Sequence, residues 1–96
     1  MKNIEDAILK VRENPYKYLG KKSLKNLDLF ISGYTSCQIN LEGTYSNWLE
    51  DFSQFIQKKF NMFYSVRYSD IISFFSVSDK HAFDEFYRLL DEFYQE

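Results

Sequence analysis

Apolar residues recur through most of this chain at the spacing of an α-helix. Near the start, Ile4, Ala7, Ile8 and Val11 are three or four residues apart, so they share one face of a helix. Similar stripes predict four further helices, at about residues 24–42, 48–60, 69–75 and 79–94. The pattern therefore predicts an all-α fold, a compact bundle of four to five helices with short loops. Because the 96 residues hold no repeat or linker, residues 1–96 are expected to form a single helical domain.

Two segments interrupt the helical pattern. Pro15 is incompatible with a continuing helix and Gly20 permits a tight reversal, so the segment before the N-cap candidate Ser23 is predicted to be a turn. Residues Met62–Val66 have the composition of a strand, but no second alternating run exists that could pair with them. We interpret this segment as an apolar loop, with a strand as the open alternative. Gly33, inside a predicted helix, is interpreted as a point where a neighbouring helix approaches closely.

Aromatic side chains are numerous enough to form much of the hydrophobic core. The chain contains ten Phe, eight Tyr and one Trp, and each large ring removes about 150–250 Å² from water on burial. The tyrosines are more numerous than a small bundle needs inside, and tyrosine is enriched at protein interfaces. The composition is therefore compatible with a protein-binding surface made of tyrosines and carboxylates.

Patterns typical of catalysis or metal binding are absent from the sequence. His81 is the sole histidine, which excludes a site with two histidine ligands, and we interpret it as a partly solvated residue of the last helix. Cys37 is the sole cysteine, and we interpret it as a small buried side chain rather than a nucleophile. Walker, dinucleotide-binding, zinc-finger and nucleophile-elbow motifs are lacking. We therefore expect neither enzyme activity nor a cofactor or metal.

The ends and the hydropathy of the chain predict its compartment. The first residues are charged and lack the apolar stretch of a signal peptide. No run approaches the roughly 20 apolar residues that are needed to span a bilayer. The sequence thus predicts a cytoplasmic protein without a membrane segment.

Charge is distributed unevenly along the chain. The net charge is only −2, yet residues 1–25 carry seven Lys or Arg against three Asp or Glu, and residues 79–96 carry six Asp or Glu against two Lys or Arg. Nucleic-acid binders usually have a net positive balance, so the asymmetry argues against DNA or RNA as the partner. The alternative is a nucleic-acid-associated or regulatory helical protein. It would use the Lys17–Lys25 basic cluster, in which Tyr16 and Tyr18 accompany Lys17, Lys21, Lys22 and Lys25.

Four stretches together resemble a known family. They are the turn Asn14–Leu24, of the form Asn-Pro-x-x-Tyr-Leu-Gly-x-x-Ser-Leu, and the helical runs Trp48–Phe60, Ile71–Phe75 and Ala82–Phe93. In this order they are similar to small bacterial proteins encoded beside toxin genes. These relatives are the immunity proteins of contact-dependent growth inhibition and of related polymorphic toxin systems.

The resemblance implies a non-enzymatic inhibitor that binds one cognate toxin domain in the cytosol. Many such toxins are nucleases with basic clefts, which an acidic surface of the inhibitor would complement. We therefore expect the partner to bind the outer face of the last helix through the following residues: Asp84, Glu85, Tyr87, Arg88, Asp91, Glu92 and Tyr94. On that face, Arg88 is spaced to pair with Asp84, Asp91 or Glu92. The activity of the toxin, the mode of inhibition and self-association through exposed Tyr and Phe stay open at this point.

Overall fold

A computed structural model describes residues 3–42, 47–63 and 66–95 of the chain. Within these residues the chain forms six α-helices and no strand, which confirms the predicted all-α fold. The helices are α1 (Ile4–Glu13), α2 (Pro15–Leu19), α3 (Leu24–Glu42), α4 (Trp48–Lys59), α5 (Tyr68–Phe74) and α6 (Asp79–Gln95).

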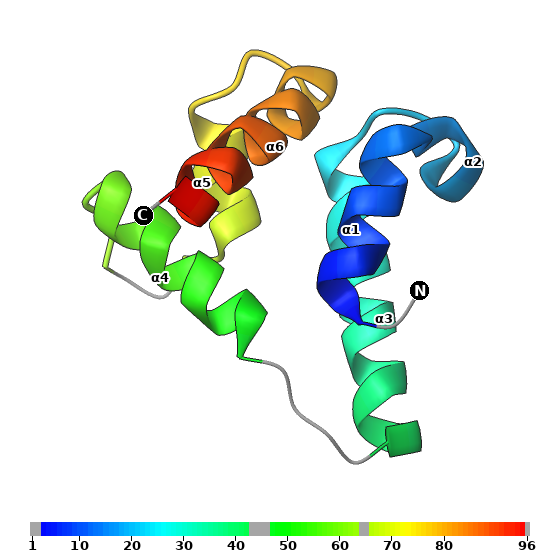
Figure 1. Cartoon of the computed structure of the whole chain (residues 1–96). Helices are drawn as coiled ribbons and strands as arrows, with labels where there is room; N and C mark the ends of the chain where they lie inside the picture. The colour runs from blue at the N-terminus through cyan, green and yellow to red at the C-terminus, as the bar shows by residue number, and fades with distance from the viewer. Residues whose placement is uncertain (1–2, 43–46, 64–65, 96) are drawn as a thin grey trace.

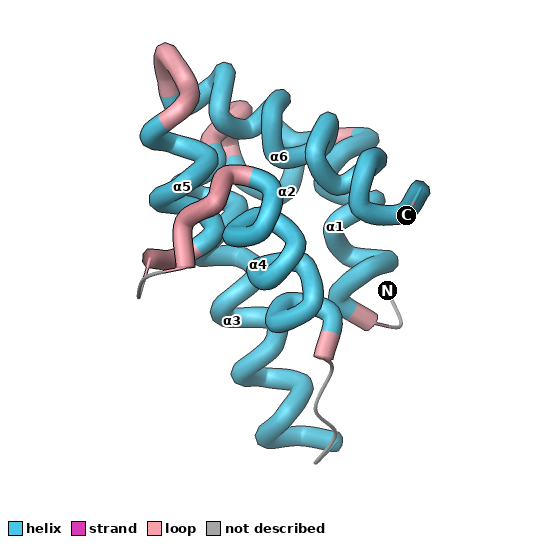
Figure 2. Tube along the Cα trace, turned by 90° about the vertical axis from the view of Figure 1, so that its left-hand side faces the viewer, coloured by secondary structure: helices cyan, strands magenta, loops and turns pink. Residues whose placement is uncertain are grey.

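The helices form two groups of three. In Figure 1, α1, α2 and α3 lie on one side of the molecule and α4, α5 and α6 on the other. Contacts of α3 with α5 and α6 join the two groups, and Figure 2 shows the short α2 folded back beside α1 and α3. The molecule measures 35 × 28 × 25 Å, so the two groups pack closely.

One hydrophobic core runs through both groups. The apolar stripe of α1 is fully buried, as the sequence predicted, and so are Leu24, Leu27 and Ile31 of α3. Phe52 of α4 is the aromatic centre of the second group, because its ring lies 5.2 Å from Phe86 and 5.9 Å from Tyr68 between ring centroids. Such edge-to-face pairs are preferred over face-to-face sandwiches and add to the burial of the rings.

The segment predicted to be a turn contains the additional helix α2. Pro15 does end α1, but it also occupies the first position of α2, where its missing N–H costs nothing. The side chain of Asn14 accepts a hydrogen bond from the Lys17 amide at 3.3 Å and caps the helix. Gly20 then adopts a left-handed conformation with φ of 79°, which terminates α2. The distinctive motif is therefore a capped helical turn followed by the predicted reversal.

Three further predictions at single positions have different outcomes. A Cβ built on Gly33 meets no atom within 4 Å, so the predicted close approach of a neighbouring helix is wrong. Cys37 is exposed, and the prediction that it is buried is also wrong. Met62, Phe63 and Val66 belong to neither helix nor strand, as expected for a loop, whereas Tyr64 and Ser65 lie outside the described residues. Gly43, which directly follows the helix predicted at residues 24–42, is also outside them.

Polar contacts fasten the start of α3 to the start of α6. Ser23 caps α3 by accepting from the Asn26 amide at 3.0 Å, and its hydroxyl donates to the carboxylate of Asp79. Asp79 also accepts from the Lys25 amide at 3.1 Å, so the first residue of α6 caps α3 as well. Burial alone would raise the pKa of Asp79, but the bonds from Ser23 and from the backbone of residues 24 and 25 lower it below its usual value.

Two contacts fasten α6 to α1. The guanidinium of Arg12 donates to both carboxylate oxygens of Asp91, each at 2.8 Å. The hydroxyl of Tyr87 donates to the carbonyl of Ile8 at 2.8 Å. These partners are 79 residues apart in the sequence, so the first and last helices of the described chain are linked directly.

Among the described residues, no helix combines the length and the apolar character that a bilayer crossing requires.

Candidate protein-interaction surface

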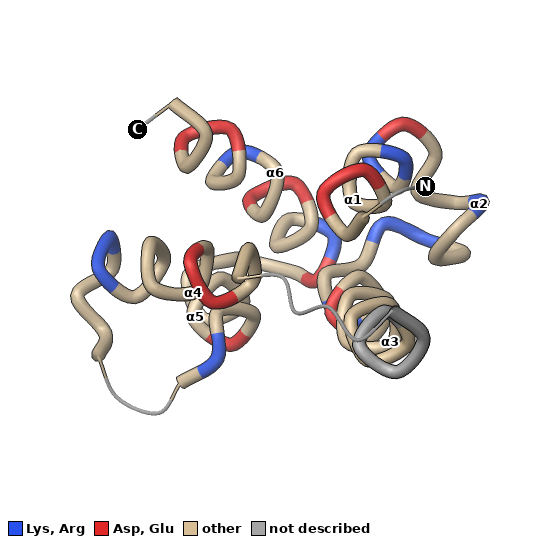
Figure 3. Tube along the Cα trace, turned by 60° about the horizontal axis from the view of Figure 1, so that its bottom comes forward, with Lys and Arg blue, Asp and Glu red and all other residues tan. Residues whose placement is uncertain are grey.

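The outer face of α6 carries most of the residues predicted to contact a partner. Ser78 starts this helix by accepting a hydrogen bond from the His81 amide at 3.0 Å. Beyond it, the buried stripe of α6 faces the core and the charged residues face outward. Figure 3 shows acidic residues along α6, whereas basic residues mark α2 and the approach to α3.

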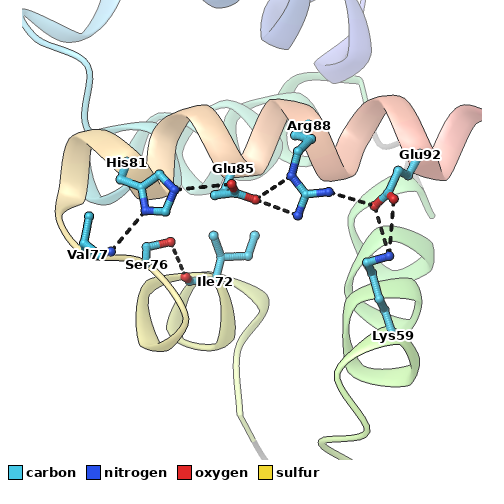
Figure 4. Close-up of polar contacts among 8 residues, drawn as sticks. All are labelled: Lys59, Ile72, Ser76, Val77, His81, Glu85, Arg88 and Glu92. Atoms are coloured by element: carbon cyan, nitrogen blue, oxygen red, sulfur yellow. Dashed lines mark hydrogen bonds and ion pairs between the residues drawn. The ribbon is translucent and has the colours of Figure 1, made fainter.

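Ionisable side chains on one side of α6 form a continuous row (Figure 4). We call it the ion-pair row, and its members are His81, Glu85, Arg88 and Glu92, with Lys59 of α4. Arg88 lies at its centre, with Nε 2.7 Å from Glu85 Oε2 and Nη1 3.6 Å from Glu92 Oε2. Lys59 approaches the buried Oε2 of Glu92 at 3.1 Å, so charge attraction rather than a well-aligned hydrogen bond holds that atom. The predicted pairing of Arg88 with Glu92 is thus present, and its second partner is Glu85.

His81 connects the row to the loop before α6. Its Nδ1 accepts a hydrogen bond from the Val77 amide at 3.1 Å, and its Nε2 lies 3.3 Å from Glu85 Oε1. A neutral imidazole with its hydrogen on Nε2 satisfies both contacts. The side chain is 38% exposed, in agreement with the partly solvated histidine that the sequence predicted.

Exposed aromatic rings lie beside this row. The rings of Phe60 and Phe75 stack with their centroids 4.9 Å apart, and Phe74 meets Phe75 edge-on at 5.0 Å. Phe74 is 75% exposed and Val77 is 91% exposed. We call these four residues the aromatic ridge. Single exposed apolar side chains are common, whereas several gathered together are a candidate for an interaction site.

A small groove separates the aromatic ridge from the ion-pair row. Its volume is about 200 Å³, and Phe60 and Phe75 line it on one side while Glu85 and Arg88 line it on the other. Ile72 and Leu89 contribute apolar surface to the same groove. A partner side chain in this groove would contact the rings of Phe60 and Phe75 and also Arg88, which Glu85 holds in place.

The aromatic ridge was not predicted from the sequence, although a signal for it exists. Phe75 is the last residue of the helix that an apolar stripe predicts at residues 69–75, yet it is 52% exposed. Four of the five residues in Ile71–Phe75 are apolar. A helix cannot turn four of five consecutive side chains inward, so part of that run had to face the solvent.

The other side of α6 faces α1. There Asp91 is engaged by Arg12, whose hydrogen bonds lower the pKa of the Asp91 carboxyl. Asp84 is exposed and forms no ion pair with any described residue, so the predicted Asp84–Arg88 pair is absent. Of the four carboxylates predicted to contact the partner, only Asp84 is therefore free of a basic neighbour.

The two predicted contact tyrosines occupy different environments. Tyr87 is only 4% exposed, and burial raises the pKa of its hydroxyl. It belongs to the core against α1, so its assignment to the partner-binding face has to be corrected. Tyr94 is 51% exposed and accepts a hydrogen bond from the indole of Trp48 at 2.8 Å. Tyr94 therefore remains available to a partner, near the start of α4.

The Lys17–Lys25 basic cluster lies on α2, on the segment that follows it and on the first turn of α3 (Figure 3). Lys17 lies over the ring of Tyr18, with Nζ 5.4 Å from its centroid. Tyr18 in turn meets Phe30 edge-on, so one of the two tyrosines of the cluster packs against the core. Tyr16, at 61% exposed, is the ring left to stack on a base.

Comparison of the chain with protein-family models, with curated proteins and with solved structures found no match.

Proposed function

We propose that this protein is a bacterial immunity protein, which binds a cognate toxin domain in the cytoplasm and neutralises it by protein–protein contact. The observation that carries the proposal is the aromatic ridge beside the ion-pair row. The resemblance of the four sequence stretches to immunity proteins of contact-dependent growth inhibition supports the same function.

The chemistry of this surface fits the binding of a protein. Contact energy in protein interfaces concentrates in aromatic and arginine side chains that become desolvated on binding. Phe74 and Phe75 supply exposed rings, and Arg88 is held next to them by Glu85. Because Arg88 is already oriented, less side-chain entropy is lost when a partner binds.

Charge contributes in a second way. Four carboxylates lie between residues 84 and 92 of α6, against the single Arg88. Arg12 and Lys59 engage Asp91 and Glu92, which reduces the acidic field of this face. We therefore assign most of the affinity to the aromatic ridge and Arg88. The carboxylates provide specificity and faster association with a basic partner.

The test is binding to the toxin domain encoded next to the gene of this protein, measured by calorimetry. Phe74→Asp should weaken the complex by about tenfold or more, the effect expected for an interface hot spot. Leu9→Asp is the matched control, because Leu9 is also exposed (47%) but lies on α1. Unchanged affinity in both Phe74→Asp and Arg88→Ala would refute the assigned surface.

The role of the carboxylates has its own test. Charge reversal at Asp84, Glu85 and Asp91 should slow association with a basic toxin and weaken its dependence on salt. Unchanged affinity together with unchanged salt dependence would remove the acidic face from the proposal.

Two other functions predict different results for the isolated protein. A nucleic-acid-associated protein that uses the Lys17–Lys25 basic cluster would bind DNA or RNA with strong salt dependence. A protein that self-associates through its exposed rings would show a dimer by light scattering. Either result, combined with no binding to the neighbouring toxin, would overturn the proposed immunity function.

A further inference from the structure

A second groove, larger than the one beside the aromatic ridge, lies between α3 and α5, where the two groups of helices meet. Its volume is about 570 Å³, within the range of roughly 300–1,000 Å³ that is typical of small-molecule sites. Asp28 and Leu29 line it from α3, and Arg67, Asp70 and Ser73 line it from the α5 side. None of its lining residues belongs to the aromatic ridge or to the ion-pair row.

A buried carboxylate with one open oxygen faces this groove. Asp28 is 8% exposed. Its Oδ1 accepts two hydrogen bonds, one from Arg67 Nη2 and one from the Tyr68 hydroxyl, each at 2.8 Å. Oδ2 accepts no hydrogen bond from the part of the chain that the structure describes. A carboxylate offers about four acceptor positions, of which these two donors use part. Asp28 is therefore oriented by its two donors and keeps acceptor capacity on Oδ2, in a side chain that lines the groove.

The other residues that line the groove determine which kind of ligand could bind Asp28 Oδ2. The carboxylate of Asp79 already accepts hydrogen bonds from Ser23 and from the backbone at the start of α3, so it has little acceptor capacity left for a ligand. Asp70 adds an exposed carboxylate to the lining, and it forms no ion pair with any described residue. Arg67, which compensates Asp28, is itself 59% exposed and therefore well screened by solvent. Lys25 also lines the groove, so three carboxylates, those of Asp28, Asp70 and Asp79, stand against two basic side chains. This net negative charge favours a cation over an anion.

Apolar surface in the groove sets the shape of the ligand. Leu29, which is 66% exposed, supplies the accessible apolar surface of the lining, whereas Leu24 is fully buried. We infer that the groove between α3 and α5 binds an ammonium or guanidinium group on a short apolar stem. The N–H groups donate to Asp28 Oδ2, and the stem lies along Leu29.

The inference is tested by titrating the full chain with n-butylammonium and n-butylguanidinium, followed by NMR of the backbone amides. Saturable shifts are expected around Asp28, Leu29 and Ser73, and the anion butyrate should produce none. Asp28→Asn keeps an acceptor for Tyr68 and Arg67 but places an NH₂ donor at the open position. It should therefore weaken binding by about 10- to 100-fold, the loss expected for one charge-assisted hydrogen bond.

Asp51→Asn is the matched control, because Asp51 is an exposed carboxylate in the first turn of α4. This variant should bind both cations like the wild type. Equal weakening in the two variants, wild-type affinity in Asp28→Asn, or equal binding of butyrate would each overturn the inference. If Asp28→Asn does not fold, Ser73→Trp, which fills the groove, should abolish the shifts, and their persistence would refute the site.

N-acetylarginine amide distinguishes the two sources of such a cation. Binding of this compound in preference to n-butylguanidinium would indicate an arginine side chain of a bound protein. The reverse preference would indicate a free small molecule. Because the groove shares no residue with the proposed toxin-binding surface, loss of cation binding would leave toxin binding intact, and the two proposals can fail separately.

Discussion

Replacement of Asp79 by Asn should destabilise the protein at neutral pH and much less in acid. Its carboxylate accepts from the Ser23 hydroxyl and from the Lys25 amide, and it lies in the first turn of α6. One side chain therefore serves the N-termini of two helices. Asn keeps one acceptor oxygen but loses the charge, so either the hydroxyl of Ser23, a residue that is 1% exposed, or the Lys25 amide loses its acceptor.

The magnitude follows from helix capping. Loss of an N-cap acceptor costs about 0.5–2 kcal/mol, and a negative charge at a helix N-terminus contributes about 0.3–1 kcal/mol where it is exposed. Asp79 itself is exposed, so solvent screening keeps its contribution toward the lower part of these ranges. We expect a loss of about 1–2 kcal/mol. For a domain of this size, each kcal/mol corresponds to a fall in Tm of about 4–8 °C.

The pH dependence identifies the carboxylate as the cause. The pKa of Asp79 is lower in the folded protein than its usual value, so its charge contributes stability above the ordinary carboxyl pKa of about 3.9. That contribution is lost as the pH falls through the lowered pKa of the folded state. The difference between wild type and Asp79→Asn should therefore be constant between about pH 5 and 8 and shrink below about pH 4.

Urea unfolding followed by circular dichroism, at neutral pH and near pH 3, measures both quantities. Asp84→Asn is the control, because Asp84 is an exposed residue of the same helix without an ion pair among the described residues, and its effect should stay within about 0.5 kcal/mol. A stability of Asp79→Asn within about 0.3 kcal/mol of the wild type at neutral pH would refute the reasoning. A difference that persists undiminished in acid would also refute it.

Three further predictions concern other contacts. Tyr87→Phe should cost about 0.5–1.5 kcal/mol in urea unfolding, because it removes the bond to the Ile8 carbonyl and keeps the ring; an unchanged midpoint would contradict the core role assigned to Tyr87. A double-mutant cycle on Arg12 and Asp91, with both changed to Ala, should give a coupling energy of about 0.2–1 kcal/mol that falls in high salt, since both side chains are nearly half exposed. Phe74→Ser should leave stability within about 0.5 kcal/mol by thermal unfolding, and a larger loss would show that the ring supports the fold rather than a partner.

Much of the fold could be predicted from periodicity because the core is built from regular stripes. The stripe from Ile4 to Val11 is buried throughout, and Trp48, Phe52 and Ile56 define the buried side of α4. Helix α2 was missed because proline was interpreted as the end of one helix, although the same residue also favours the first position of the next.

The candidate surface was predictable only in part. The charged row on α6 follows from its sequence, since residues three and four apart are neighbours on a helix. The position of Tyr87 does not follow, because it lies at the edge of the buried stripe and its burial depends on α1, 79 residues away. The partners of Asp91 and Asp79 lie 79 and 56 residues away, so a single sequence contains no signal for them.

The link between α1 and α6 has a consequence for how the protein is made. While the ribosome is still adding the early part of α6, Arg12 has no carboxylate to bind, the Ile8 carbonyl has no tyrosine donor and Ser23 has just gained Asp79. The first three helices can collapse during synthesis, but these polar groups stay hydrated until the final helix emerges. We expect nascent chains that stop before residue 87 to remain sensitive to protease and to become resistant only after Asp91 has left the exit tunnel.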